Sequence, residues 1–195
     1  DSDGLELPTP KYLRKAEANL KKEQRKLSRK LEAAKKDKRD YSKCKNYKEQ
    51  RLKLSRLHKH VANQRLDFIR NVVNEEVKNH DYLFAEDLKT CNLIKNPKLA
   101  KAISDSGWRM FLIELQNCAS KRGKTCLLVN PKNTTQTCSN CGYVCHGNTH
   151  ITLGKEEWIC PNCGAYHIRD YNAGKNILAT GLVLLKESGV TLSIK

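Results

Sequence analysis

Two pairs of cysteines have the spacing that most directly indicates chemistry. Cys138 and Cys141 form one Cys-x-x-Cys pair, and Cys160 and Cys163 form a second pair after eighteen intervening residues. A two-residue spacer lets both thiolates of a pair bind one ion from a tight turn, and four thiolates complete the tetrahedral shell of a structural zinc ion. Two disulfides or four buried thiols are the alternative interpretations. We predict one Zn²⁺ site here.

Two carboxylates stand at the ends of predicted elements. Glu86 follows the short apolar run of residues 82–85, which predicts a buried strand, and Asp170 opens a run of helical period over 169–179. A carboxylate at the end of a buried strand is where α/β folds place their chemistry, although Glu86 could instead cap the next segment or pair with a lysine. RNase H-like nucleases hold divalent ions, Mg²⁺ or Mn²⁺, with three or four such carboxylates. This sequence offers two.

The positive charge is concentrated near one end of the chain. The formal net charge is +16, and residues 11–60 hold 20 Lys and Arg against 6 Asp and Glu. A charge run is often only a solvated face, but one this dense favours a polyanionic partner, and its apolar positions lack the aromatic residues of a membrane-surface helix. We therefore predict that this segment binds nucleic acid. The basic residues that we select as contacts are Lys21, Lys22, Arg25 and Arg29, with Arg169 beside Asp170.

The remaining composition indicates a reducing compartment. Cys44, Cys91, Cys118 and Cys126 have no partner spacing, which is typical of reduced thiols in a cytosol. No apolar run approaches the roughly 20 residues needed to span a bilayer, and the first ten residues do not resemble a signal peptide. We expect a cytoplasmic protein with no membrane partner.

Periodicity predicts the elements that must position these residues. Leu13, Leu20 and Leu27 recur every seven residues and predict a helix over 10–36, in which Thr9 is a candidate cap. A bend over 37–46 and a second helix over 47–79 complete an antiparallel hairpin, apolar inside and basic outside. A short strand is predicted over 5–7, ending in a turn.

The second half of the chain predicts a βαβ unit with parallel strands. Its strands cover about 82–86 and 124–130, its helix covers 107–121, and Ser104, Asp105 and Ser106 offer a cap for that helix. A polar connection with a short helical piece covers 91–103. Trp158 and Ile159 indicate a small hairpin before the second cysteine pair, and residues 181–195 indicate a weakly held tail.

Several motifs occur together and in order: FAEDL, ISDSGW, NPKNTTQTCSNCG, WICPNCG and RDYNAGKNIL. With SDGLELPTPKYLRKAE and SRLHKHVANQRLDFI, they make the chain resemble the TnpB (OrfB) proteins of small insertion sequences over essentially its whole length. These proteins are similar to compact type V CRISPR effectors, whose nuclease domain is RuvC-like. The resemblance implies RNA-guided cleavage of DNA, with DNA and guide RNA as partners, in the nucleoid of a prokaryote.

The resemblance also implies roles for single residues. Glu86 and Asp170 correspond to the second and third RuvC carboxylates, and the four cysteines correspond to the zinc ligands of a target-nucleic-acid-binding insertion. The first carboxylate of the family lies in a G-[IV]-D-x-G strand, which this sequence lacks, and Asp1 and Asp3 match the turn that follows. We therefore expect a C-terminal portion of a longer protein with impaired cleavage, in which neither Asp87 nor Asp105 substitutes.

The predicted fold class is α/β: a partial RNase H-like (RuvC) fold with a long basic helical hairpin insertion and a four-cysteine zinc ribbon. The predicted segments are the end of a first β-hairpin (1–9), the basic hairpin (10–80), the βαβ core (81–135), the zinc ribbon (136–166), the C-terminal RuvC-like helix (167–180) and the tail (181–195). One alternative is a non-enzymatic nucleic-acid-binding or regulatory remnant. A zinc-ribbon transcription or ribosome-associated factor is weaker, because it leaves the carboxylates unexplained.

Overall fold

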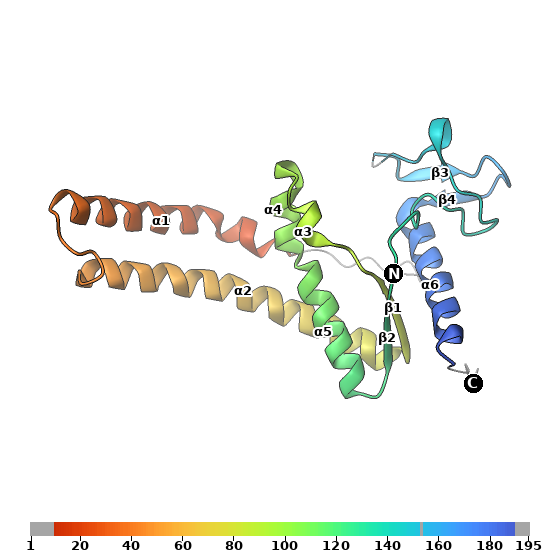
Figure 1. Ribbon diagram of the computed structural model, residues 1–195, viewed down its shortest axis with the longest axis horizontal. Coiled ribbons are helices and arrows are strands. Elements are labelled where there is room, and N and C mark those ends of the chain that lie inside the picture. Colours follow the sequence, from red (N-terminus) through yellow and green to blue (C-terminus); the bar gives the residue numbers. More distant parts are fainter. Residues whose placement is uncertain (1–9, 153, 190–195) are drawn as a thin grey trace. The chain divides into compact units, whose positions relative to one another are not determined.

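The computed structural model describes residues 10–152 and 154–189 (Figure 1). They belong to two compact units, which we call the helical unit (residues 10–74 and 90–111) and the sheet unit (residues 75–89 and 112–189). The strand predicted over 5–7 and the cap predicted at Thr9 lie outside the described residues.

Two long helices dominate the helical unit. Helix α1 covers Tyr12–Lys36 and helix α2 covers Lys45–Asn79, close to the bounds predicted from the leucine period. The helices run antiparallel (Figure 1), and Leu20, Leu54 and Val61 form the buried centre of their seam. Although α2 has 35 residues, neither it nor any other helix among the described residues is long and apolar enough to cross a membrane.

Polar side chains also lie within this seam, which was predicted to be apolar. Glu23 of α1 is only 3% exposed and accepts a hydrogen bond of 2.7 Å from the side-chain amide of Gln50, which also donates to the Glu23 carbonyl. Lys26 and Lys53 lie 2.8 and 3.4 Å from the Glu23 carboxylate and balance its charge. These bonds hold the pKa of Glu23 at about 2, and they tie α1 to α2 at one register.

The role of Asp105 in the structure differs from the predicted one, which was to cap the helix over 107–121. It lies in the last turn of helix α4 (Pro97–Ser106), which follows the short helix α3 (Thr90–Leu93). Its carboxylate accepts the backbone N–H groups of Leu13 and Arg14 at the start of α1, at 3.0 and 3.4 Å, and a 2.9 Å ion pair from Arg65. The cap prediction was wrong because an isolated pattern cannot show that a distant helix supplies unpaired N–H groups.

The sheet unit contains the predicted parallel strands. Strand β1 (Tyr82–Glu86) pairs with β2 (Thr125–Val129), and Glu86 lies opposite Val129 where both strands end. Helix α5 (Trp108–Lys121) precedes β2 and buries Leu112 and Leu115. The parallel pairing follows from the helical crossover between the strands.

A small antiparallel hairpin and a helix complete this unit. Strands β3 (Glu157–Ile159) and β4 (Tyr166–Ile168) pair as predicted from Trp158 and Ile159, after a 3₁₀ turn, η1 (Gly147–Thr149). Helix α6 covers Arg169–Glu187 and contacts both β1 and β2. It therefore continues through the first part of the segment expected to be a tail, because Leu185 is fully buried and Gly181 packs against Phe84.

Candidate functional site

Glu86 is the last residue of β1 and is partly buried. Its carboxylate accepts a hydrogen bond from the hydroxyl of Thr134, a buried residue in the loop that follows β2. The Asp87 N–H donates to the Val129 carbonyl at 2.9 Å, which continues the pairing one residue beyond the strand. The strand end and the loop therefore hold the Glu86 side chain between them.

Asp170 lies in the first turn of α6, where a negative charge is favoured by the helix dipole. The Arg169 guanidinium donates to its carboxylate at 2.9 Å, and the Asp170 side chain is 77% exposed. An exposed carboxylate with one cationic neighbour is available to a ligand. Arg169 therefore lies against Asp170 in this structure, and its predicted contact with nucleic acid stays a prediction.

The elements that carry the two carboxylates are packed against each other. Helix α6 carries Asp170, and it packs on β1, the strand that ends in Glu86. Over residues 10–152 and 154–189, the four cysteines are the only group of three or more His, Cys, Asp or Glu side chains placed to share a metal ion. No third carboxylate of the described residues thus joins Glu86 and Asp170 in such a group. Carboxylate oxygens are the ligands that Mg²⁺ and Mn²⁺ prefer, so each of the two residues has the chemistry of a ligand for either ion.

The four predicted cysteine ligands lie together. All four Sγ atoms are within 4.8 Å of one another, and the Cys138–Cys163 and Cys141–Cys160 Sγ distances are both 3.7 Å. Four sulfur atoms bound at about 2.3 Å to one zinc ion lie about 3.8 Å apart, so the donor set and its spacing fit zinc. All four are free thiols, so the structure does not contain the alternative disulfides.

The two cysteine pairs have the same backbone turn. Gly142 and Gly164 donate 2.9 Å hydrogen bonds to the carbonyls of Cys138 and Cys160, and both glycines have positive φ angles, of 74° and 72°. Such angles favour glycine because it has no Cβ. The repeated turn directs both thiols of each pair to the same centre.

The turns also exchange hydrogen bonds that stabilise thiolates. The side-chain amide of Asn140 in the first turn, followed by the Ala165 N–H, lowers the pKa of Cys163 to about 6. Asn162 in the second turn lowers the pKa of Cys141 in the same way, whereas burial raises the pKa of Cys138 to about 12. The lowered pKa values favour the thiolate forms of the exposed residues Cys141 and Cys163. The buried Cys138 thiol needs a nearby cation to ionise.

Neighbouring residues complete the surroundings of the cysteines. Cys145 is buried in the same cluster as Cys138 and Cys160 but is not one of the four residues placed to share an ion, and His146 contacts the Val144 carbonyl. His167, which we did not predict, has its Nε2 atom 3.0 Å from Cys138 Sγ and its ring against Trp158. The alternation of β4 could have indicated His167, because His167 pairs with buried Trp158 across the hairpin.

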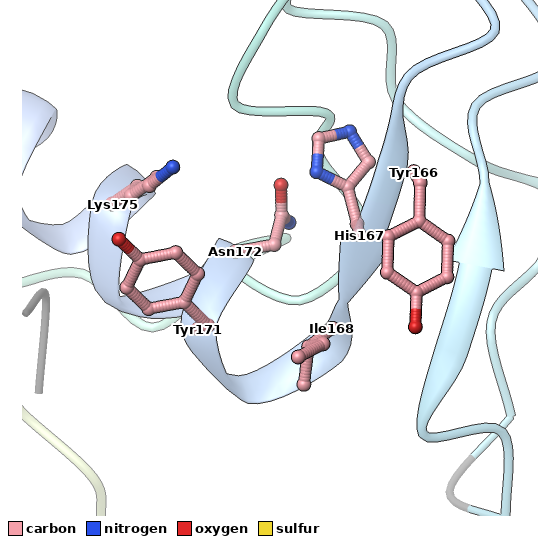
Figure 2. Close-up of a pocket in the computed structure, with 6 residues that line it drawn as sticks. All are labelled: Tyr166, His167, Ile168, Tyr171, Asn172 and Lys175. Atoms are coloured by element: carbon pink, nitrogen blue, oxygen red, sulfur yellow. The ribbon is translucent and has the colours of Figure 1, made fainter. Parts of the chain in front are cut away.

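A shallow hollow lies where β4 meets α6 (Figure 2). It has a volume of about 230 Å³ and is lined by Tyr166, His167, Ile168, Tyr171, Asn172 and Lys175. The Lys175 ammonium lies 4.4 Å from the centre of the Tyr171 ring, a cation–π distance. The lining of the hollow thus combines aromatic surface with the Lys175 cation.

The predicted nucleic-acid contacts on α1 are all exposed. Lys21, Arg25 and Arg29 recur every four residues and therefore lie along one face of the helix, with Lys22 beside them. Lys21 forms an exposed ion pair with Glu17 at 2.8 Å, which is weak enough to be exchanged for a phosphate. The face can offer cations to a polyanion without unfolding the seam.

Two family models match this chain. Residues 1–97 match the OrfB_IS605 family, described as "Probable transposase", and residues 108–177 match the Cas12f1-like TNB domain. Together the two matches include the sequences around Glu86, Asp170 and the four cysteines.

Individual relatives match nearly the whole chain. A "Putative RNA-guided DNA endonuclease" of Streptomyces pristinaespiralis is 34% identical over 182 residues, which are 93% of this chain and 42% of that protein. The "Putative RNA-guided DNA endonuclease InsQ" of Escherichia coli is 30% identical over 199 residues, 94% of this chain and 46% of the relative. The chain thus spans less than half the length of these two relatives.

A similar fold is found in a solved structure. It is the Cas12f1 chain of a cryo-EM complex with sgRNA and target DNA, with a TM-score of 0.51 at 18% identity. The match covers 64% of this chain and 36% of the Cas12f1 chain. At this identity, the likeness concerns the fold alone.

Proposed function

Because this chain belongs to the TnpB (OrfB) family of insertion-sequence proteins, we propose that it is the RuvC-like nuclease part of a transposon-encoded, RNA-guided DNA endonuclease. One observation carries the proposal. Glu86 ends a strand of a parallel βαβ unit, and Asp170 lies in the first turn of the helix that packs on that sheet. That is the arrangement of carboxylates in RNase H-like nucleases.

The proposed reaction is hydrolysis of a DNA phosphodiester. Glu86 and Asp170 would hold Mg²⁺ or Mn²⁺, which would supply the activation of water and the stabilisation of the leaving oxygen. The chain's own residues hold the ligands in place: Thr134 orients Glu86, and Arg169 limits the rotation of Asp170.

We further propose that the four cysteines bind one structural zinc ion and that residues 136–166 form a zinc ribbon. The 3.7 Å sulfur spacing and the duplicated turn support this proposal. A zinc ion held there would be closed to substrate, because four protein thiolates would fill its tetrahedral shell. Its role is to stabilise the segment that leads into α6.

The basic face of α1 is proposed to bind the phosphate backbone of the guide RNA or the target DNA. Its charge, exposure and regular spacing support binding without base readout, which agrees with base pairing as the source of specificity. Association with the nucleoid follows from this proposal.

The resemblance identifies two of the three RuvC carboxylates within these 195 residues. We therefore propose that the 195 residues alone bind nucleic acid tightly and cleave it poorly, because bound metal ions lack one ligand that positions them. The exposed cations along α1 also favour a second candidate, a non-enzymatic nucleic-acid-binding protein.

A cleavage assay separates the two candidates. Single- and double-stranded DNA are incubated with the chain and Mg²⁺ or Mn²⁺, with co-purified RNA retained and with Asp170→Ala as the comparison. We expect salt-sensitive binding with little cleavage, and any cleavage should disappear in Asp170→Ala. Cleavage that persists in this variant, or a chain that does not bind nucleic acid, would contradict the proposal.

A further inference from the structure

We propose that the side-chain amides of Asn172 and Asn176 couple the metal-binding cysteines to the two carboxylates, so that metal at the cysteines fixes the positions of Glu86 and Asp170. The consequence of this coupling for catalysis rests on the proposed function.

Asn172 joins the first cysteine turn to the start of α6. Its side chain, on the first turn of the helix (Figure 2), is only 1% exposed. Its amide oxygen accepts the Ser139 N–H at 2.9 Å, and its amide nitrogen donates to the Thr137 carbonyl at 2.7 Å. These backbone groups flank Cys138, so the position of one metal ligand and the position of the helix depend on the same side chain.

Asn176 extends the contact to the end of β1. One turn after Asn172, its amide nitrogen donates to the carbonyls of Thr134 and Thr137, at 2.8 and 2.7 Å. The hydroxyl of Thr134 in turn donates to the Glu86 carboxylate. A continuous series of hydrogen bonds thus runs from the cysteine turn, through two asparagines of α6, to Glu86.

An amide is the side chain that these contacts require. Asn172 donates and accepts at the same time, which no aliphatic side chain can do and which an ionised carboxylate cannot do. Asparagine is also unfavourable inside a helix, so two of them on one face of α6 indicate a requirement other than helix formation. Because a functional carboxylate must be held to within about 0.5 Å, a loop tied to a metal site is a suitable support.

The coupling is tested without any cleavage assay. Hydrogen exchange of the 195-residue chain is measured with zinc bound and after chelation, and zinc affinity is measured by competition with a coloured chelator. Removing zinc should accelerate exchange at residues 171–178 of α6 as well as at the cysteine turn. In Asn172→Ala, α6 should exchange rapidly even with zinc bound, and zinc affinity should fall about tenfold, because coupling is reciprocal.

Asn63→Ala, at an exposed asparagine of α2, is the matched control and should change neither quantity. Asn176→Ala is the milder variant to use if Asn172→Ala does not fold, and it should accelerate exchange at α6 while zinc remains bound. Protection of α6 that is unchanged by chelation, or an asparagine variant that behaves like Asn63→Ala, would overturn the coupling.

The link to Glu86 has its own pair of variants. Thr134→Val keeps the shape of the side chain and removes the hydroxyl, whereas Thr134→Ser keeps the hydroxyl. Thr134→Val should weaken Mn²⁺ binding several-fold and Thr134→Ser should preserve it; equal affinity in the two variants would overturn this step. If no variant binds Mn²⁺ while the zinc-dependent protection of α6 holds, the proposed nuclease function fails and the coupling stands.

Discussion

The helical unit and the sheet unit are built on different principles. In the α1–α2 seam, apolar residues such as Leu20 and Val61 recur along two long helices, and a few polar contacts fix the register. In the sheet unit, the short strands β1 and β2 and the cysteine site are held in position by single side chains. Asn172 is one of them: it is buried and forms hydrogen bonds with two backbone groups. A regular seam spreads its stabilisation over many residues, whereas the sheet unit concentrates it in a few.

This difference suits the two proposed roles. A backbone-binding arm needs exposed charge on a stable rod, and no single cation on it is essential. A carboxylate site needs exact positions, so each supporting residue matters. Substitutions should therefore have large local effects in the sheet unit and graded effects on α1.

The largest effect is expected from Cys160→Ser. Loss of one thiolate should release the metal and unfold the segment over 138–165, because structural zinc contributes on the order of 10 kcal/mol in small metal-binding domains. The helices α1 and α2 should remain. Metal content and far-ultraviolet circular dichroism measure the two effects.

Cys91→Ser, at an exposed free thiol, is the control and should retain the metal. Metal content that is unchanged in Cys160→Ser would contradict the four-cysteine site.

Asp105→Ala tests whether the helical unit also has a single critical residue. It removes the cap of α1 and the carboxylate that pairs with the mostly buried Arg65, which should cost about 3 kcal/mol. Thermal unfolding followed at 222 nm measures the loss. A change below about 0.5 kcal/mol, the size typical of surface substitutions, would show that the leucine seam alone sets this unit's stability.

The same residue predicts a pH dependence. Burial opposes ionisation of Asp105, but hydrogen bonds from Arg65, Leu13 and Arg14 outweigh it and hold its pKa below the usual value. Because this pKa is lower in the folded chain, the stabilisation is present above about pH 4 and is lost as the pH falls through the folded value. Unfolding measured from pH 2 to 7 should show a smaller acid-induced loss in Asp105→Asn than in the unaltered chain.

Gly181→Ala should have an intermediate effect on the packing of α6 on β1. A Cβ atom there would lie 2.2 Å from Phe84 Cγ, so the helix or the ring must move, at a cost of about 2 kcal/mol. Gly154→Ala, where nothing lies within 4 Å, should be neutral. Denaturant unfolding compares them, and equal stability would contradict the close contact of α6 with β1.

The smallest effect on folding is expected from neutralising Lys21, Lys22, Arg25 and Arg29 together. Stability should hardly change, whereas the slope of log affinity against log salt should fall by about 3, because four phosphate contacts are lost. The matched control neutralises four exposed lysines of the sheet unit, Lys121, Lys132, Lys155 and Lys186. A larger change in slope for the control would place the polyanion surface outside α1.

The sequence predicted what depends on local pattern. The seven-residue leucine period located α1, and the apolar runs ending in Glu86 and Val129 located the parallel strands. It also predicted which cysteines come together, because their spacing is itself a local property.

The sequence did not predict the partners of isolated polar residues. Asp105 was interpreted as a cap for the helix that follows it, but it caps α1, more than ninety residues away in the chain. The sequence around Asn172 and His167 contains no spacing pattern that predicts their partners. Those partners lie about thirty residues earlier, at the first cysteine turn. Such contacts are decided by tertiary packing, which a short window of sequence does not contain.

The central claim is that Glu86 and Asp170 belong to one divalent-metal site, and Mn²⁺ binding followed by electron paramagnetic resonance tests it most directly. The zinc-loaded chain is titrated alongside Glu86→Gln, Asp170→Asn and Asp67→Asn, the last at an exposed aspartate of α2. Weak Mn²⁺ binding that is lost in either of the first two variants and kept in Asp67→Asn is the predicted result. Binding that is unaffected by both carboxylate substitutions, or no binding by the unaltered chain, would contradict the claim.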